Sequence, residues 1–476
     1  MAGAMKTSWI PNVVPAVLAV AGVLALGLWT STGLIGSLPK REPGRDGTPQ
    51  PKAAQDLAPV KAGQPIRGDG QPANIRGDWP AFRGAQRNNI CTDETRLARS
   101  WPASGPPVRW QIDVGEGYAA AAIADGRAYL IDYDETAQAD MLRCLSLTDG
   151  REIWRNGYPV SIAPNHGMSR TIPALAGDAV VSIGPRCHVA CWDASTGECR
   201  WLIDMVRQFG TEERQWYTGQ CPLIDGDRVM LAPCGPDSLL TAVDIKTGNI
   251  VWKTPNPRGW KMTHSSIMPM EFAGRRMVVY CGSGGTAGMA TDSGAELWVE
   301  ENWKENFATS PSPVPLPGGR IFLSSGYDEI GAMLLQLEET AGRLTAEKAF
   351  TLTRRQFGSE QQTPVLYQDH LYGVRKAARG QLVCLNLDGK ELWNSGQLKF
   401  GHGPYLIADG LVLALSEDGL LAAVEATPET FRLVAKHQVI PDGREAWGPL
   451  ALVGGQLVLR DLKRMFCVDL KAVDKP

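Results

Sequence analysis

The clearest pattern in the sequence is an apolar run, a polar turn and a second run that ends in tryptophan. In the central copy, apolar residues 239–243 lead into the turn Asp244–Gly248, and residues 249–252 lead out of it to Trp252. Asp, Lys, Thr and Gly are turn formers, and Gly248 can adopt the positive φ that a hairpin bulge requires. The pattern therefore predicts a β-hairpin.

The hairpin recurs along the chain with a tryptophan four residues after a glycine. The five pairs are Gly150 with Trp154, Gly197 with Trp201, Gly248 with Trp252, Gly294 with Trp298, and Gly389 with Trp393. Successive tryptophans are 47 (154 to 201), 51 (201 to 252) and 46 (252 to 298) residues apart, and the step from 298 to 393 spans two repeats. Repeats of this length, each holding several short strands, are typical of β-propeller blades.

Two repeats depart from the hairpin pattern. The fifth lacks the glycine and tryptophan, and Phe350 is expected to take the place of the tryptophan. The seventh has Pro428 and Phe431 where the hairpin is expected. The sequence still supplies strands in both, so they count as blades.

The last repeat, residues 446–470, lacks an outer strand. Residues 108–113, which include Trp110, resemble such a strand at the other end of the domain. Pairing the first strand with the last would close the ring and remove an open sheet edge. Residues 105–476 number 372, or 46.5 for each of eight blades. We therefore predict an all-β, eight-bladed propeller, with seven blades as the alternative.

The region before the propeller divides into two segments. Residues 7–39 carry no charge, and residues 13–29 are almost wholly apolar, so residues 1–38 are expected to form a transmembrane anchor, with a cleaved signal peptide as the alternative. Lys6 precedes the span and Lys40, Arg41 and Arg45 follow it, which leaves the orientation open. Residues 39–77 are rich in Pro, Gly and charged residues, so we expect a disordered linker. The propeller is placed at residues 78–476, with Trp79 and Phe82 plugging onto its body.

The net charge bears on the binding partners, and the positions of the cysteines bear on disulfide formation. The net charge of −3 and the pI of about 6.1 give no indication of nucleic-acid binding. Cys144 and Cys191 lie ten residues before a repeat tryptophan, Cys384 lies nine before, and Ala242 holds the same place in the central copy. A position that alternates between Cys and Ala indicates a small core site rather than a disulfide. The disulfide state of the ten cysteines and the redox compartment stay open.

The repeats resemble the tryptophan-docking motif of pyrroloquinoline-quinone-like (PQQ-like) propellers, Ala-x-Asp-x-x-x-Gly-x-x-x-Trp. Ala242, Asp244, Gly248 and Trp252 match it fully, and the other copies match in part. The resemblance covers about residues 78–476 and implies the fold. It also implies two functions, because this superfamily includes quinoprotein dehydrogenases as well as non-catalytic scaffolds such as the lipoprotein of the outer-membrane assembly machinery.

The dehydrogenases hold PQQ and Ca²⁺ with Glu, Asn and Asp, use an Asp base and have a disulfide between adjacent cysteines. This sequence has no adjacent cysteine pair. We therefore expect no catalytic residues, no metal site and no cofactor. The expected function is a membrane-anchored, extracytoplasmic, non-catalytic protein-binding or scaffold module. The alternatives are a PQQ- and calcium-dependent alcohol or sugar dehydrogenase and a ligand-binding sensor propeller.

Ligands of propellers usually bind at the mouth formed by the loops that lead into the innermost strands. In this chain those loops carry polar and aromatic residues, and His264 and His402 hold equivalent positions in blades four and seven. We expect a protein or peptide partner at this funnel or at the propeller rim, and contact with the membrane through residues 7–38. The candidate ligand-binding residues are Tyr118, Arg170, Tyr217, His264, Ser265, Gln361, Gln362, His402 and Trp447.

Overall fold

The computed structural model describes residues 17–24, 59–304, 309–327 and 330–472. The chain divides into two compact units, Met1–Pro51 and Lys52–Pro476. In the first unit, residues 17–24 form a helix with exposed apolar side chains, and the rest of the predicted anchor lies outside the described residues. No helix in the described part of the chain is both long enough and apolar enough to span a membrane.

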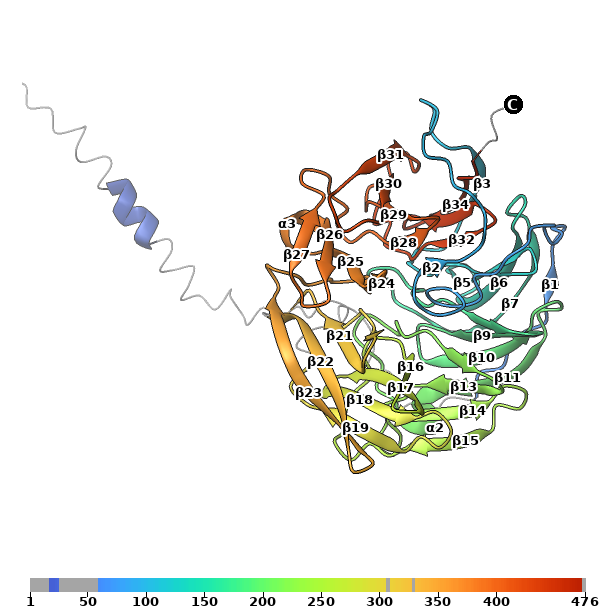
Figure 1. Cartoon of the computed structure of the whole chain (residues 1–476). Coiled ribbons are helices and arrows are strands. Elements are labelled where there is room, and N and C mark those ends of the chain that lie inside the picture. The colour runs from blue at the N-terminus through green and yellow to red at the C-terminus, as the bar shows by residue number, and fades with distance from the viewer. Residues whose placement is uncertain (1–16, 25–58, 305–308, 328–329, 473–476) are drawn as a thin grey trace, which may run out of the picture. The chain divides into compact units, whose positions relative to one another are not determined.

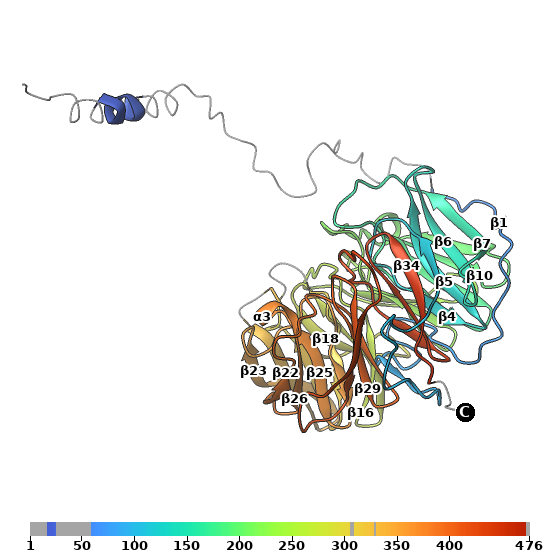
Figure 2. The same ribbon diagram turned by 90° about the horizontal axis from the view of Figure 1, so that it is seen from above.

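The second unit is an eight-bladed β-propeller (Figure 1, Figure 2). Eight sheets, each with a core of four antiparallel strands, follow one another around a ring. The prediction of an all-β, eight-bladed architecture is confirmed, and the seven-bladed alternative is wrong. Each blade is a meander in which the first strand lies innermost and the last lies outermost.

The strands of the first four blades have these bounds. Blade one contains β4 (Ala122–Ala124), β5 (Arg127–Asp134), β6 (Ala139–Ser146) and β7 (Glu152–Pro159); blade two contains β8 (Ala174–Ala176), β9 (Ala179–Ile183), β10 (His188–Asp193) and β11 (Cys199–Asp204). Blade three contains β12 (Leu223–Asp225), β13 (Arg228–Leu231), β14 (Leu240–Asp244) and β15 (Ile250–Thr254); blade four contains β16 (Met268–Phe272), β17 (Arg275–Gly282), β18 (Gly285–Ala290) and β19 (Glu296–Glu300).

The other four blades complete the ring. Blade five contains β20 (Val314–Leu316), β21 (Arg320–Ser324), β22 (Ile330–Thr340) and β23 (Arg343–Thr353); blade six contains β24 (Val365–Tyr367), β25 (His370–Arg375), β26 (Gln381–Asn386) and β27 (Glu391–Asn394). Blade seven contains β28 (Tyr405–Ala408), β29 (Leu411–Leu415), β30 (Leu420–Glu425) and β31 (Leu433–Gln438); blade eight contains β32 (Ala451–Val453), β33 (Gln456–Arg460), β34 (Arg464–Asp469) and β3 (Val108–Asp113). The short helical segments α2 (Met205–Phe209) and α3 (Ala377–Gly380) lie in connections.

Blade eight is built from both ends of the propeller. Strand β3 pairs antiparallel with β34, and Trp110 lies opposite Cys467. The outer strand that the last repeat lacks is therefore the one that the sequence places at residues 108–113. The pairing joins the first blade strand of the chain to the last and closes the ring.

The repeat tryptophans fasten each blade to the next. In all but one of them, the indole Nε1–H donates a hydrogen bond to a backbone carbonyl in the following blade, which satisfies the one polar atom of a buried ring. The bonds run from Trp110 to Leu147 (2.9 Å), Trp154 to Ala194 (3.0 Å), Trp201 to Ile245 (2.8 Å), Trp252 to Thr291 (3.2 Å) and Trp393 to Thr427 (2.7 Å).

The hairpin glycine makes room for that ring. Gly248 has a φ of 72°, and a Cβ added to it would lie 3.0 Å from the Trp201 ring. Within each blade a small residue lies opposite the tryptophan, as Cys191 does for Trp201 and Ala242 for Trp252. All ten cysteines of the chain are free, and the prediction that Cys and Ala share a small core position is confirmed.

Blade five explains the exception to this pattern. Blade five lacks the glycine hairpin, and its β22–β23 connection offers Trp298 of blade four no carbonyl; the Nε1–H of Trp298 lies 3.4 Å from the Met277 sulfur instead. Phe350 takes the tryptophan's place, since it packs against the next hairpin glycine, Gly389, where an added Cβ would lie 2.9 Å from the Phe350 ring. The predicted replacement of tryptophan by Phe350 is therefore correct.

The segment before the first blade is ordered from residue 59. Strand β1 (Ile66–Arg67) pairs with β7 at the outer edge of blade one, and Gly63 and Ala73 bond the backbone of the same blade. The linker prediction is therefore corrected for residues 59–77, because backbone pairing to an exposed strand edge orders a segment that has too few apolar side chains to fold alone. Residues 39–58 lie outside the described part.

A conservative substitution isolates the hydrogen bond between blades. In Trp252→Phe a smaller aromatic ring replaces the indole and the N–H is lost, so the Thr291 carbonyl keeps only its bond from Arg228 (3.3 Å). We expect the free energy of unfolding to fall by about 1–3 kcal/mol. Trp298→Phe is the matched control. Thioether sulfur is a weak acceptor, so removing the N–H of Trp298 should lower the free energy of unfolding less. Denaturant titration measures both, and equal costs would contradict the role given to the carbonyl.

Candidate functional site

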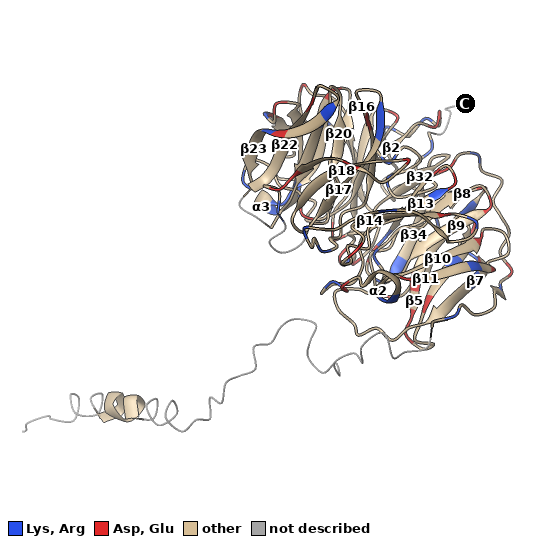
Figure 3. Cartoon of the chain, turned by 90° about the horizontal axis from the view of Figure 1, so that it is seen from below, with Lys and Arg blue, Asp and Glu red and all other residues tan. Residues whose placement is uncertain are grey.

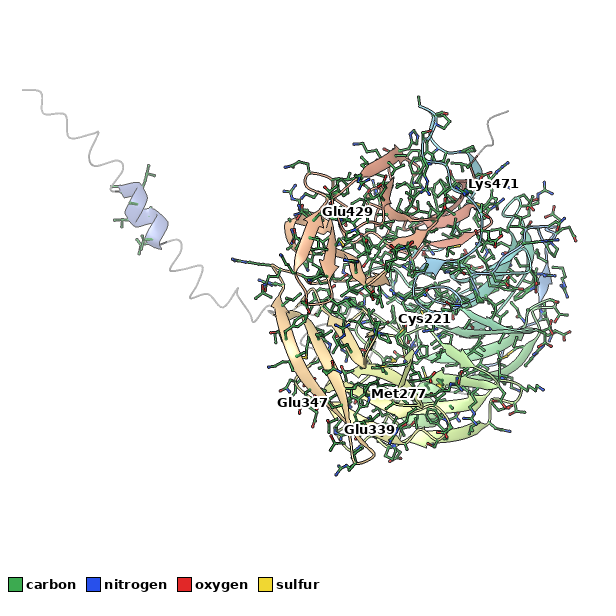
Figure 4. The ribbon with its side chains drawn as sticks, viewed as in Figure 1. Cys221, Met277, Glu339, Glu347, Glu429 and Lys471 are labelled. Carbon is green, nitrogen blue, oxygen red and sulfur yellow. The ribbon has the colours of Figure 1, made fainter. Side chains whose placement is uncertain are left out.

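A cavity of about 390 Å³ lies on the propeller axis. Its upper wall comes from the loops that lead into the innermost strands, and Cys221, labelled near the middle of the ring in Figure 4, lies on its lining. Its floor is made by Phe82, Arg83 and Asn89, which belong to the segment between β1 and β3. We call residues 79–91 the plug.

The plug is held by hydrogen bonds to the innermost strands around the ring. Arg83 is buried and donates to the carbonyls of Thr363 (2.7 Å) and Pro364 (2.9 Å), and Arg87 donates to the carbonyl of Pro222 (3.0 Å). Asn89 donates to the carbonyl of Tyr405, and strand β2 (Ile90–Cys91) pairs in parallel with β28. The predicted plugging by Trp79 and Phe82 is correct, and it blocks one end of the axial channel.

Seven of the nine predicted ligand-binding residues line this cavity. They are Tyr118, Arg170, His264, Gln361, Gln362, His402 and Trp447. The other two do not: Ser265 is fully buried, and the Tyr217 hydroxyl donates to the Ala163 carbonyl (2.6 Å). The loops therefore converge as the repeat pattern predicts. The direction of each side chain within its loop depends on other contacts, which the repeat pattern does not predict.

One wall of the cavity is a stack of aromatic rings capped by a cation. Tyr118 and Trp447 stack with centroids 5.0 Å apart at 27°. The guanidinium carbon of Arg170 lies 5.3 Å from the Tyr118 centroid on the ring face, which is a cation–π contact. The Tyr118 hydroxyl donates to Glu445, and burial with this carboxylate raises the pKa of Tyr118.

Beside this stack lies a histidine between two carboxylates, with the His402 ring centroid 5.0 Å from that of Trp447. His402 Nε2 lies 2.6 Å from Glu360 Oε2, and its Nδ1 lies 3.1 Å from Glu417 Oε2. Lys376 pairs with the other oxygen of Glu360, and the Trp447 indole N–H donates to Glu417 (3.2 Å). The network joins blades six, seven and eight at the mouth.

The charges of this network follow from the ion pairs. Burial alone would lower the pKa of His402, but the hydrogen bonds and charges of Glu360 and Glu417 raise it above its ordinary value. Burial would raise the pKa of Glu360, but His402 and Lys376 lower it below its ordinary value. The two carboxylates therefore favour the protonated imidazolium over the neutral ring.

The second mouth histidine is in the opposite state. Burial lowers the pKa of His264 to about 3, with further lowering by Arg170 and Arg214. Neither ring nitrogen of His264 has a hydrogen-bond partner in the described structure, and its ring lies 6.4 Å from that of Trp216. Equivalent places in two blades thus carry a neutral and a charged histidine.

Several lining residues were missed by the sequence reasoning. Glu360 directly precedes the two predicted glutamines, so its position in the same loop was a usable signal. Tyr327 lies in blade five, where the degenerate repeat hid the loop. The plug residues Phe82, Arg83 and Asn89 come from outside the repeat, so no repeat-based argument could place them on the axis.

The arrangement does not fit a calcium-bound PQQ. Among the described residues no group of three or more His, Cys, Asp and Glu is placed to hold a metal ion. Glu360 has both carboxylate oxygens bonded to cations, and Glu417 accepts from His402 and Trp447, so neither presents a free oxygen pair to a cation. Of the lining cations, Arg83 is committed to backbone carbonyls, which leaves few groups for a tricarboxylate such as PQQ.

Charge is distributed evenly outside the cavity. Figure 3 shows lysines and arginines interspersed with acidic residues over the blades. Many of them form ion pairs at the surface, such as Arg258 with Glu296 and Arg276 with Asp225. In this view the described residues form no continuous basic track of the kind that binds a nucleic-acid backbone.

Comparison with known proteins agrees with the fold. A family model described as outer membrane protein assembly factor BamB, a model of PQQ-like repeats, matches residues 138–385. BamB from Moraxella catarrhalis is 14% identical over 76% of this chain and 99% of its own, with a TM-score of 0.51. The computationally designed protein Ika8 is 12% identical over 76% and 100%, also with a TM-score of 0.51. A quinohemoprotein alcohol dehydrogenase from Pseudomonas putida HK5 is 10% identical over 84% and 82%, with a TM-score of 0.47. No curated protein matches the sequence.

The raised pKa of His402 gives a testable pH dependence. Its folded-state pKa lies above the unfolded value of about 6.5, so its stabilising contribution is fully present below about pH 6.5 and is lost as pH rises through the folded pKa. We expect wild type to exceed His402→Gln in the free energy of unfolding most at low pH. The excess should shrink as pH rises above about 6.5 and through the folded pKa.

Denaturant titrations across this range measure the difference. His264 is present in both proteins, so its own titration cancels. A difference that stays constant or grows with pH would contradict the assignment of His402 as an imidazolium.

Proposed function

Because the chain belongs to the PQQ-like propeller family, we propose that it is a non-catalytic protein-binding or scaffold module whose partner docks at the mouth of the axial cavity and the adjoining rim. The observation that carries this proposal is the cavity itself. It is blocked below by the plug, and it is lined by aromatic rings and amides whose positions are fixed by hydrogen bonds. A preorganised, polar and aromatic recess of this kind favours recognition.

The state of the titratable groups on the lining also supports binding over catalysis. A general base must be unprotonated and free to accept a proton. Both ring nitrogens of His402 are bonded to carboxylates, Glu360 pairs with His402 and Lys376, and His264, with a pKa of about 3, is a weak base. Burial raises the pKa of Cys221, so this lining cysteine is a thiol rather than a nucleophilic thiolate.

The family description supports a protein as the partner. The matching model is described as an assembly factor for outer membrane proteins, and BamB from Moraxella catarrhalis shares the fold. On this basis we propose that the present chain also binds a partner protein. We further propose that residues 7–38 attach the chain to a membrane, with the propeller on the extracytoplasmic side and residues 39–58 as the tether.

Site-specific photo-crosslinking tests the docking surface. A photoreactive amino acid at Gln361, on the cavity lining, should yield a discrete cross-linked protein in cells. The matched control is the same substitution at Glu347, an exposed residue of β23 that lies at the outer edge of a blade in Figure 4. Equal cross-linking at both positions would show that the partner does not dock specifically at the mouth.

Equilibrium dialysis tests the catalytic alternative. The purified full chain is dialysed against PQQ and Ca²⁺ and then assayed with a redox dye and alcohol or sugar donors. We expect neither stoichiometric PQQ binding nor dye reduction. Turnover in this assay would establish a quinoprotein oxidoreductase and end the scaffold proposal.

The proposed anchor has its own test. The full-length chain should stay with membranes after washing in alkaline carbonate, because an apolar span is held by the hydrophobic effect rather than by charge. A variant that lacks residues 1–38 should be released. Recovery of a mature N-terminus near residues 31–40 would show instead that the segment is a cleaved signal peptide.

A further inference from the structure

Arg170 is a lining cation that forms no ion pair and keeps a side-chain N–H without a hydrogen-bond partner in the described structure. The other cations on the lining are engaged: Arg83 donates to backbone carbonyls, and His402 lies between Glu360 and Glu417. Arg170 forms no ion pair with any carboxylate in the described structure. Its Nη2 donates to the carbonyls of Asn165 (2.9 Å) and Gly167 (3.2 Å), while its Nε is buried with no hydrogen-bond partner.

The loop before Arg170 fixes the guanidinium in this place. His166 and Gly167 have φ values of 49° and 75°, which turn the two acceptor carbonyls toward Arg170. Met168 N–H donates to Glu116, and Ser169 accepts from the backbone N–H of Tyr118 and of Ala119. Below the guanidinium lies the Tyr118 ring, itself stacked on Trp447. A charged group held this firmly costs little ordering when a ligand binds.

An unpaired polar N–H in a buried position is costly, and a ligand that accepts from it recovers that cost. Because Nη2 is committed to the two carbonyls, a carboxylate would accept a charge-assisted hydrogen bond from the unpartnered Nε–H. A singly charged carboxylate matches the single charge of this guanidinium, whereas a phosphate dianion would add more negative charge near Glu360 and near Glu445, which already interacts electrostatically with Arg170. The neutral His264, with both ring nitrogens unpartnered, adds a donor and an acceptor suited to a backbone amide.

We propose that Arg170 anchors a carboxylate-recognition site for an acidic peptide segment, in which the Asp, Glu or C-terminal carboxylate of a partner protein enters the axial cavity. The apolar part of the same segment packs on Tyr118 and Trp447, and its backbone amides face His264 and the two glutamines. The proposal rests on the proposed protein-binding function and specifies what the mouth recognises. A free organic acid would offer the same carboxylate, and the experiment separates the two sources.

Peptide selection tests the site on the full chain in detergent micelles. The immobilised wild-type protein selects from a random heptapeptide library that includes free C-termini. We expect enrichment of peptides that carry a carboxylate, and Arg170→Gln should weaken the best of them by about tenfold or more. Arg170→Lys should lose less peptide affinity than Arg170→Gln, because lysine keeps the positive charge. The matched control is Arg186→Gln, since Arg186 already pairs with Glu213 (2.7 Å) and should change affinity less than about twofold.

A double-mutant cycle distinguishes direct pairing from a general effect. Replacing the peptide carboxylate by an amide should cost wild type about tenfold and cost Arg170→Gln little more. Selection without acidic enrichment, or equal costs of carboxylate removal in both proteins, would overturn the proposal. Thermal melting of each variant checks that the fold is retained. If no peptide is selected but millimolar succinate binds to the protein, the site recognises free organic acids. That result would overturn the proposal of a peptide ligand.

The failure of this inference differs from failure of the proposed function. If cross-linking at Gln361 persists unchanged in Arg170→Gln, the binding module stands and the carboxylate site is wrong. If PQQ turnover is found, the proposed function itself fails, whatever the peptides do.

Discussion

The hydrogen bond from an indole N–H of one blade to a backbone carbonyl of the next is the interaction on which the rest of the structure depends. It joins neighbouring sheets, and where the next blade has the hairpin the ring packs against a glycine with positive φ, while the residue opposite the ring in its own sheet is small. Trp201, Gly248 and Cys191 show all three features together. Where blade five lacks the hairpin, Trp298 bonds a sulfur and Phe350 supplies bulk without the polar contact. The regular ring then brings eight loops to one mouth, which is what makes a site there.

The plug turns this ring from a channel into a recess. Propeller axes are polar and wet in general, and the loops at one face would by themselves line an open passage. Here Arg83 and Asn89 bond carbonyls of the innermost strands and place a floor beneath the mouth residues. A recess with a floor has a defined depth, so it can distinguish a side chain that reaches the bottom from one that does not. The site is therefore a joint product of the repeat and of a segment outside it.

The sequence predicted the fold well because its strongest signal is a repeated local motif. The Gly-x-x-x-Trp spacing required only short-range turn chemistry, and it correctly identified blade eight through Trp110. It also brought most of the mouth residues together, since equivalent loops of a propeller must converge. What it missed depended on long-range contacts. The plug has no repeat signature, β1 is ordered by pairing with β7 rather than by its own side chains, and Tyr217 is turned aside by one bond to Ala163. The different charge states of His264 and His402 likewise arise from neighbours on other blades.

The sharing of blade eight between the two ends of the domain has a consequence for biosynthesis. Strand β3 leaves the ribosome long before β34, and until β34 emerges β3 has no neighbour with which to pair. The nascent propeller thus carries an unsatisfied sheet edge through almost the whole of translation, and such edges are where chains associate wrongly. Closure between such distant parts of the sequence is also entropically slow. The step most exposed to misassembly is accordingly the last one, and a chain that ends before β34 is left with an open ring whatever the quality of its other blades.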